Sequence, residues 1–411
     1  MTLGIISIFV LIVLVGGSAF FLLQIKPRKS LGLKDLYSEG LDMLVSGHRK
    51  GAYQNFKSIV QKDTENIKAY LKLGQVAREG GNAEQALKIH KSLLLRTKMT
   101  PFEQIEMHKN LALDYYNLGH LDSAIDETCK ILDQEKKNEW ALSQLVMFYR
   151  EFGDWKKAGE YLVRLQNAID QIDDRKVGLY KIQEGRISLE KSQFDTARSL
   201  FQEALRIEET LGTAYYFLGN SFVEESEQSY ELSVRIDERS SQSVEDQKQY
   251  NESLEKAKIL LSKAIPMWTR FTEMEPHLSW MVIPKLKDAL FAMERYNEIE
   301  SILKLILTKD SDNTDALATL ADFYHHRGDV REAIELIESA IEKDNDSLIA
   351  RIIRLKLKMQ SSDSRKINIE MDTIIEMLTT SRDRYFKYDE NEKSDMGWLL
   401  ETSGQPDKYI Q

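Results

Sequence analysis

The chain contains very little cysteine, proline or glycine: 1, 6 and 20 residues of 411, respectively. The single cysteine, Cys129, excludes an intramolecular disulfide and a metal site built from several cysteines, and it agrees with a reducing compartment. We expect Cys129 to be a small buried apolar side chain. The scarcity of helix-breaking residues and of strand-like alternation, together with 30% charged residues, indicates an all-α fold.

Positive charge and catalytic motifs are lacking as well. The formal net charge is −10, which argues against general nucleic-acid binding because that function needs a basic surface to displace counterions from phosphates. There is no phosphate-binding glycine loop, no Gly-x-Ser-x-Gly turn and no Cys/His nucleophile pattern. The adjacent His325 and His326 diverge by about 100° on a helix, so we expect surface histidines and not a metal site. We predict a protein that is not an enzyme and needs no cofactor or metal.

One stretch lacks charge altogether, from Leu3 to Ile25. At about 1.5 Å per residue, a helix of this length crosses a hydrocarbon core of about 30 Å. Only two uncharged residues precede it, so it lacks the basic start of a cleaved signal peptide. Lys26, Arg28 and Lys29 follow it, and positive residues remain on the cytoplasmic side. We predict a single transmembrane helix over residues 3–25, with the bilayer as a partner and the rest of the chain in the cytoplasm.

Most of the remaining chain repeats with a period near 34 residues. Residues 110–134 show the unit, in which two stretches of helical spacing meet at Gly119. One small or apolar residue recurs at the same place of the second stretch: Ala52, Ala86, Ala124, Ala158, Ala197, Ala264, Ile299 and Ala333. The gaps are 34, 38, 34 and 39 residues up to Ala197, then 67, 35 and 34. A period of this length made from two short helices is the signature of tetratricopeptide repeats.

Other positions of the repeat agree with this interpretation. Gly40, Gly74 and Gly185 each precede the recurring alanine by twelve residues, and Phe56 and Phe201 follow it by four. Small residues let two helices approach where they cross, while larger ones stack one hairpin on the next. We predict a solenoid of about eight helical hairpins over residues 31–345. Such an array is either a spacer or, more commonly, a peptide-binding surface lined by the first helix of each pair.

Two segments depart from the repeat. Residues 227–255 are a polar insertion, for which a disordered loop and a two-helix spur are equally good explanations, and a functional arm is a further alternative. Residues 346–411 form the tail, in which we expect one helix to about Lys358 and another over residues 367–380. Beyond Arg382 the apolar period is lost.

Several stretches resemble the lipopolysaccharide assembly protein B family of Gram-negative bacteria. They are the uncharged N-terminal span, residues 37–94 with AYLKLGQVAREGG and ALKIHKSLL, and residues 284–303 with PKLKDALFAMERYNEIESIL. The resemblance covers most of the chain and implies a tetratricopeptide adaptor in the bacterial inner membrane. It also implies partners: the family helps a membrane-bound AAA protease degrade the deacetylase of lipid A biosynthesis, which limits lipopolysaccharide synthesis.

The tail departs from the family pattern. Members of the family end in a rubredoxin-like zinc knuckle with two Cys-x-x-Cys pairs, the second preceded by tryptophan. Here Arg384, Tyr385 and Trp398 match the frame, but the four thiolate places hold Lys387, Glu390, Leu400 and Ser403, none of which makes a structural zinc site. The tail is therefore a degenerate knuckle or an unrelated segment, and a family role that needs the metal is in doubt.

An adaptor needs a groove, and the register of the repeats predicts which first-helix residues line it. The candidates are Lys68, Lys72, Gln75, Arg78, Lys109, Asn110, Tyr116, Trp140, Gln144, Met147, Arg150, Arg186 and Asn220. Their basic members predict an electropositive strip for an acidic peptide, although a solvated helix face with ordinary charge scatter explains them equally well. Trp140 is either a partner anchor or part of the core between repeats.

We therefore predict a non-enzymatic, membrane-anchored scaffold that brings a client enzyme to a membrane protease. The alternative is a general scaffold for another cell-envelope assembly complex. The oligomeric state and the identity of the client stay open.

Overall fold

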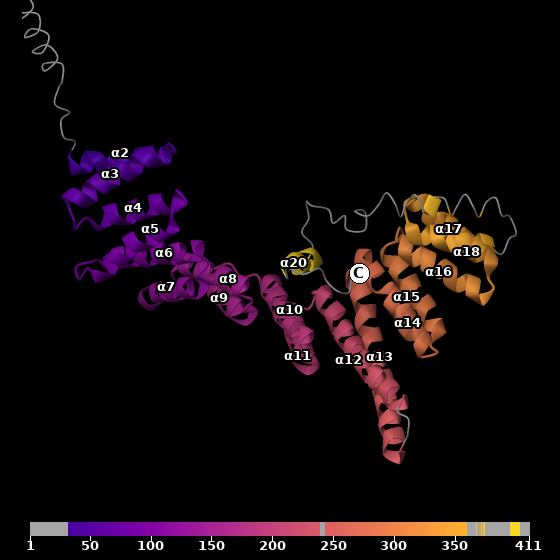
Figure 1. Cartoon of the computed structure of the whole chain (residues 1–411). Coiled ribbons are helices and arrows are strands. Elements are labelled where there is room, and N and C mark those ends of the chain that lie inside the picture. Colours follow the sequence, from indigo (N-terminus) through magenta and orange to yellow (C-terminus); the bar gives the residue numbers. More distant parts are fainter. Residues whose placement is uncertain are drawn as a thin grey trace, which may run out of the picture. The chain divides into compact units, whose positions relative to one another are not determined.

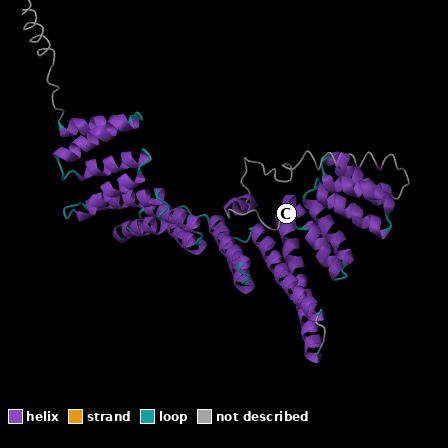
Figure 2. Cartoon of the chain, viewed as in Figure 1, coloured by secondary structure: helices purple, strands orange, loops and turns teal. Residues whose placement is uncertain are grey.

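The structure is a computed structural model, and it describes residues 32–238, 243–359, 367, 371, 373–374 and 395–402. Every regular element in these ranges is a helix (Figures 1 and 2). Among the described helices, none has both the length and the apolar character needed to cross a bilayer. The predicted transmembrane segment, residues 3–25, lies outside the described residues. The chain divides between Phe148 and Tyr149 into two compact units, which we describe separately.

The first unit is a series of helical hairpins. Gly47, Gly81 and Gly119 close the turns within three of them at φ values of 76°, 84° and 75°, a region that glycine enters without steric cost. The helices are α2 (Leu33–Val45), α3 (Arg49–Lys62), α4 (Ile67–Glu79), α5 (Ala83–Lys91) with the 3₁₀ turn η1 (Ser92–Leu95), α6 (Pro101–Asn117), α7 (Leu121–Gln134) and α8 (Glu139–Phe152), which continues into the second unit.

The second unit continues with the same kind of pairs, joined by turns at Gly153, Ser192, Glu294 and Gly328 with positive φ. Its helices are α9 (Trp155–Ile169), α10 (Asp174–Glu190), α11 (Phe194–Ile207), α12 (Gly212–Asp237), α13 (Val244–Met274), η2 (Pro276–Met281), α14 (Ile283–Ala292), α15 (Tyr296–Lys309), α16 (Thr314–Arg327), α17 (Val330–Lys343), α18 (Leu348–Met359) and α20 (Asp395–Thr402). The all-α repeat fold predicted from the sequence is confirmed.

The polar insertion is helical where the structure describes it. Residues 227–237 continue α12, and residues 244–255 begin α13, so these two helices are 26 and 31 residues long and lie side by side (Figure 1). The Oγ of Ser226 donates to the Ala257 carbonyl at 2.8 Å, and Glu225 accepts from both Arg198 and Lys256 at 2.8 Å. Of the two explanations left open by the sequence, these residues fit the two-helix spur.

The recurring small residue lies where the two helices of each pair cross. All eight predicted positions, from Ala52 to Ala333, are at most 1% exposed. Where the first helix carries a glycine at the crossing, this glycine faces a large side chain of the second helix, four residues after the recurring small residue. A Cβ on Gly185 would lie 2.4 Å from Phe201, and a Cβ on Gly219 would lie 2.4 Å from Trp268. We call this glycine-to-large-side-chain approach the crossing contact.

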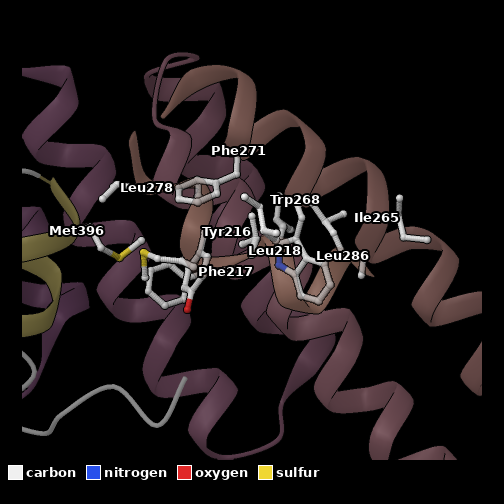
Figure 3. Close-up of a cluster of buried hydrophobic side chains, with 14 of the residues drawn as sticks. Tyr216, Phe217, Leu218, Ile265, Trp268, Phe271, Leu278, Leu286 and Met396 are labelled. Carbon is white, nitrogen blue, oxygen red and sulfur yellow. The ribbon is translucent and has the colours of Figure 1, made fainter. Parts of the chain in front are cut away.

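The longest continuous core belongs to the second unit. It runs from α10 to α16 and includes Tyr216, Phe217, Trp268 and Phe271, each at most 1% exposed. Figure 3 shows these side chains around α12 and α13, with Met396 of α20 beside them. The tail thus contributes to the core of the repeats.

The crossing contact predicts opposite effects of two glycine-to-alanine changes. Gly185→Ala should lower the free energy of unfolding by about 1–3 kcal/mol, because the new methyl group forces Phe201 and α11 away from α10. Gly159→Ala should leave it unchanged or raise it by up to about 1 kcal/mol, since the nearest atom is 3.7 Å away and alanine favours helix. Urea unfolding followed by circular dichroism measures both. Equal effects of the two changes would contradict the crossing contact.

Candidate partner-binding groove

The structure turns one pair of predicted groove residues toward the interior of the first unit. Arg78 of α4 donates to Asp114 at 2.7 Å and to the side-chain oxygen of Asn110 at 3.2 Å. The same Asp114 contacts the Nδ1 of His90, while the Nε2 of His90 faces the Leu71 carbonyl at 3.1 Å. Asp114 and His90 are fully buried, so Arg78 and Asn110 stabilise the stacking of α4 on α6.

Other candidates of this unit pair with neighbours. Lys72 donates to Gln75 at 2.8 Å, and the Nζ of Lys109 lies 5.5 Å from the centre of the half-buried Trp140 ring. Lys109 also pairs with Glu106 at 2.9 Å. The positive charge of the predicted strip is therefore partly neutralised within the unit.

The remaining first-unit candidates differ in how exposed they are. Tyr116 lies 5.1 Å from Phe148, ring centre to ring centre. Lys68 is exposed on α4, and Gln144 and Met147 are half-buried on α8. Cys129, for which we expected a small buried apolar side chain, is only half-buried.

In the second unit, two predicted groove residues contact the tail. Arg150 lies above the ring of Trp398 in α20, 5.7 Å from the ring centre, and 5.8 Å above Trp155. Trp398 stacks on Tyr180 at 5.6 Å and meets Trp155 edge to face at 6.0 Å. These separations fall within the favourable range for aromatic and cation–π pairs. A tryptophan of the tail is thus held by three repeat residues, one of which the sequence predicted.

Arg186 binds the main chain of the same helix. Its guanidinium donates to the Leu399 carbonyl at 2.5 Å, and the side-chain amide of Gln183 donates to the same oxygen at 2.9 Å. Leu399 lies in the last turn of α20, where carbonyls have no partner within the helix. A cation also suits the partial negative charge of a helix C-terminus. Arg186 and Gln183 therefore cap α20.

Apolar contacts complete the docking of α20. Met396 and Leu399 are fully buried in the core of the second unit, and Arg175 pairs with Asp395 at 2.6 Å at the other end of the helix. The sequence predicted that the apolar period is lost beyond Arg382, but residues 395–402 form a helix with two buried apolar side chains, Met396 and Leu399. A helix as short as α20 shows no clear apolar period in the sequence, although its buried residues Met396 and Leu399 have i, i+3 spacing.

Asn220 of α12 has a different neighbourhood. Its Oδ1 accepts from the Nε1 of Trp268 and from the Nζ of Lys285, both at 3.2 Å. Both neighbours are donors, so this assignment of oxygen and nitrogen is the one that satisfies them. The amide nitrogen of Asn220 is buried without a hydrogen-bond partner among the described residues. It borders a cavity of about 870 Å³ between α12, α13 and α14.

A separate cluster of charged side chains surrounds Asp322 of α16. Lys356 donates to its carboxylate at 2.5 Å, and Lys287 lies 3.5 Å from it. Burial raises the pKa of Asp322, but the Lys356 hydrogen bond and the surrounding positive charges outweigh this effect and hold the pKa below its ordinary value of 3.8. His326 contributes to that charge from 3.8 Å. This cluster links α14, α16 and α18.

Comparisons with known proteins agree with the fold. Residues 290–355 match the tetratricopeptide repeat family model. Lipopolysaccharide assembly protein B of Escherichia coli (strain K12) is 28% identical over 142 residues, which are 34% of this chain and 36% of that protein. The Haemophilus influenzae protein of the same name is 28% identical over 208 residues, 49% of this chain and 52% of that protein. The matches thus span about a third to a half of the relatives.

Two solved structures are similar over part of the chain. The MamA protein is 22% identical and covers 43% of this chain and 92% of its own, with a TM-score of 0.33. A tetratricopeptide repeat protein from Cytophaga hutchinsonii is 12% identical and covers 77% of this chain and 98% of its own, with a TM-score of 0.35.

The helix pairs, together with the match over residues 290–355, make the described part of the chain an all-helical array that is similar to tetratricopeptide repeat proteins. The chain is similar to lipopolysaccharide assembly protein B, as its sequence predicted. The prediction that the chain is a scaffold and not an enzyme agrees with both findings. Of the knuckle frame, the described residues include Trp398, which packs on α10, whereas Arg384, Tyr385, Lys387, Glu390 and Ser403 lie outside them.

Loss of the Arg186 cap should loosen α20. In Arg186→Met, amides of residues 395–402 should exchange hydrogen at least about tenfold faster, because a charged hydrogen bond contributes about 1.5–3 kcal/mol. Hydrogen–deuterium exchange measures this, with Arg206→Met as a control on the exposed face of α11. Unchanged exchange in Arg186→Met would show that the other contacts hold α20 without the Arg186 cap.

The lowered pKa of Asp322 predicts a pH dependence of stability. The carboxylate contributes stability above its unfolded-state pKa of about 3.9, and this contribution is lost as the pH falls through the lower folded-state pKa. Asp322→Asn should therefore cost about 1 kcal/mol at pH 7, since its lysine partners remain partly exposed, and the cost should shrink below about pH 4. Urea unfolding between pH 7 and 3 tests this, with the exposed Glu332→Gln as control. A cost that stays constant with pH would refute the assignment.

Proposed function

We propose that the chain is a non-enzymatic adaptor for lipopolysaccharide assembly that binds protein partners through its repeats. The observation that carries this proposal is the contact between α10 and α20, in which Gln183 and Arg186 bind a main-chain carbonyl and Trp398 lies against Tyr180. First-helix residues of the repeats thus bind a helical segment by its main chain and by an aromatic anchor. A segment of another protein with these features fits the same kind of surface.

The finer part of the proposal follows the similarity to lipopolysaccharide assembly protein B. The adaptor presents a client enzyme of lipid A biosynthesis to a membrane AAA protease at the bacterial inner membrane. The mechanism is positioning: the chain performs no chemistry, and tethering client and protease together raises their effective concentration. Residues 3–25 anchor the chain in the bilayer as a single pass, with the solenoid in the cytoplasm. The uncharged sequence of this segment supports the anchor.

A general scaffold for another envelope assembly complex is the second candidate. The departure of the tail from the family pattern favours it, because Lys387, Glu390, Leu400 and Ser403 occupy the thiolate places. In this case, the fold serves different partners from those of the relatives.

Partner capture distinguishes the two candidates. Full-length protein purified from gently solubilised membranes should enrich the membrane protease and the lipid A deacetylase, compared with a control in which residues 3–25 are replaced by an unrelated membrane helix. Mass spectrometry identifies both. Recovery of other envelope proteins without these two would favour the general scaffold. A reporter fused after Gln411 that is active only in the periplasm would exclude a cytoplasmic adaptor.

A further inference from the structure

The main-chain cap of α20 and the buried amide of Asn220 occupy matching places in successive repeats. Arg186 directly follows Gly185, and Asn220 directly follows Gly219. Both glycines form the crossing contact, with Phe201 and Trp268 respectively, so the two side chains leave their helices in the same register. Arg186 and Asn220 are thus donors at matching places of α10 and α12, and Gln183 and Lys285 are their hydrogen-bonded neighbours. We call these four residues the donor row.

The donor of Asn220 differs from that of Arg186 in having no acceptor among the residues that the structure describes. Trp268 and Lys285 fix the amide by its oxygen, so the nitrogen faces away from both. Asn220 is only 2% exposed, and a buried donor without a partner destabilises a protein. The position is therefore prepared for an acceptor that arrives from outside the repeat.

The cavity beside Asn220 has the shape and lining of a docking site for a peptide. Its volume of about 870 Å³ is in the range of ligand-binding clefts. Apolar side chains line its walls, and they come from all three helices: Val223, Tyr230, Leu254, Leu261, Ala289 and Met293. Tyr230 is 55% exposed, so the cavity is open to an incoming side chain.

The charges around the cavity indicate which peptide fits. Lys285 lies beside the Asn220 amide, where a group with partial negative charge is favoured. The lining also carries the exposed Glu227, Asp288 and Lys258 and the half-buried Glu224. Its three carboxylates outnumber Lys258 and can accept basic side chains. A helix C-terminus combines both features, because its last carbonyls are free and basic residues are favourable in its last turn. The donor row already binds one carbonyl of a helix end, that of Leu399 in α20, although the last turn of α20 carries no basic residue.

We propose that the cavity between α12, α13 and α14 binds the last turn of an amphipathic helix from a partner protein. The amide of Asn220 donates to a free main-chain carbonyl of that helix, an apolar side chain of the helix enters the cavity, and a basic residue pairs with Glu227 or Asp288. This inference deepens the proposed adaptor function and rests on it for the identity of the partner.

A direct test uses two synthetic helical peptides and the full chain in detergent. Both peptides carry Met and Leu with the spacing of Met396 and Leu399 and a fluorescent label. One has two lysines in its last turn, and the other has two glutamates. Fluorescence anisotropy should show binding of the lysine peptide at least about tenfold tighter than binding of the glutamate peptide. No binding of either peptide, or preference for the glutamate peptide, would overturn the proposal.

The variant Asn220→Asp isolates the proposed donor. It keeps an oxygen for Trp268 and Lys285 but replaces the amide nitrogen by an acceptor, so the lysine peptide should bind about tenfold or more weakly. Asn251→Asp makes the same chemical change on exposed α13 and should leave binding unchanged. Ala292→Trp, at the exposed rim of the cavity, should weaken binding without touching Asn220. If the natural protein, Asn220→Asp and Ala292→Trp all bind the lysine peptide equally tightly, the proposal is refuted.

Partner capture with the same variant separates this inference from the adaptor function. If the natural protein captures its partners and Asn220→Asp retains all of them, the adaptor function stands and the docking site is wrong. If the natural protein captures none while the lysine peptide binding depends on Asn220, the docking site stands and the adaptor function fails.

Discussion

The close approach of two helices at a glycine is the constraint on which the rest of the structure depends. At Gly74, Gly185 and Gly219, no side chain larger than hydrogen fits, because His90, Phe201 and Trp268 of the second helix occupy the space. This contact sets the distance between the two helices in each of these three pairs. It also puts the residues that directly follow Gly185 and Gly219 in the same register, and the donor row is one result.

The identity of the large side chain in this contact changes what the neighbouring repeat can do. Phe201 contributes an apolar surface alone. His90 adds two polar ring atoms, and these connect α5 to Asp114 of α6 and to the Leu71 carbonyl of α4. Trp268 adds one indole N–H, which orients Asn220. One packing position therefore carries an apolar contact, a polar link between repeats, or the orientation of a binding residue.

The repeat fold could be predicted from the sequence because its signal is periodic. The eight crossing positions recur every 34 to 39 residues, except for the gap of 67 between Ala197 and Ala264, and packing demands a small or apolar residue at each of them. The groove was harder, because register indicates the face of a helix and not the partner of a side chain. Arg78 shows the difference: it lies on a predicted first-helix position, but a buried carboxylate 36 residues away binds it. Arg150, Arg186 and Asn220 lie at the candidate site, whereas Gln183, Lys285 and Trp398 were missed.

The contact between α10 and α20 also determines the order in which the protein can fold during synthesis. Most helix pairs contact only their neighbours, so each can form soon after it leaves the ribosome. Gln183 and Leu399, in contrast, are 216 residues apart. The surface formed by Tyr180, Gln183 and Arg186 therefore remains uncovered while those residues are translated. For this interval the nascent chain exposes an aromatic, main-chain-binding surface, which makes it a site where a chaperone or an early partner can bind before the tail arrives.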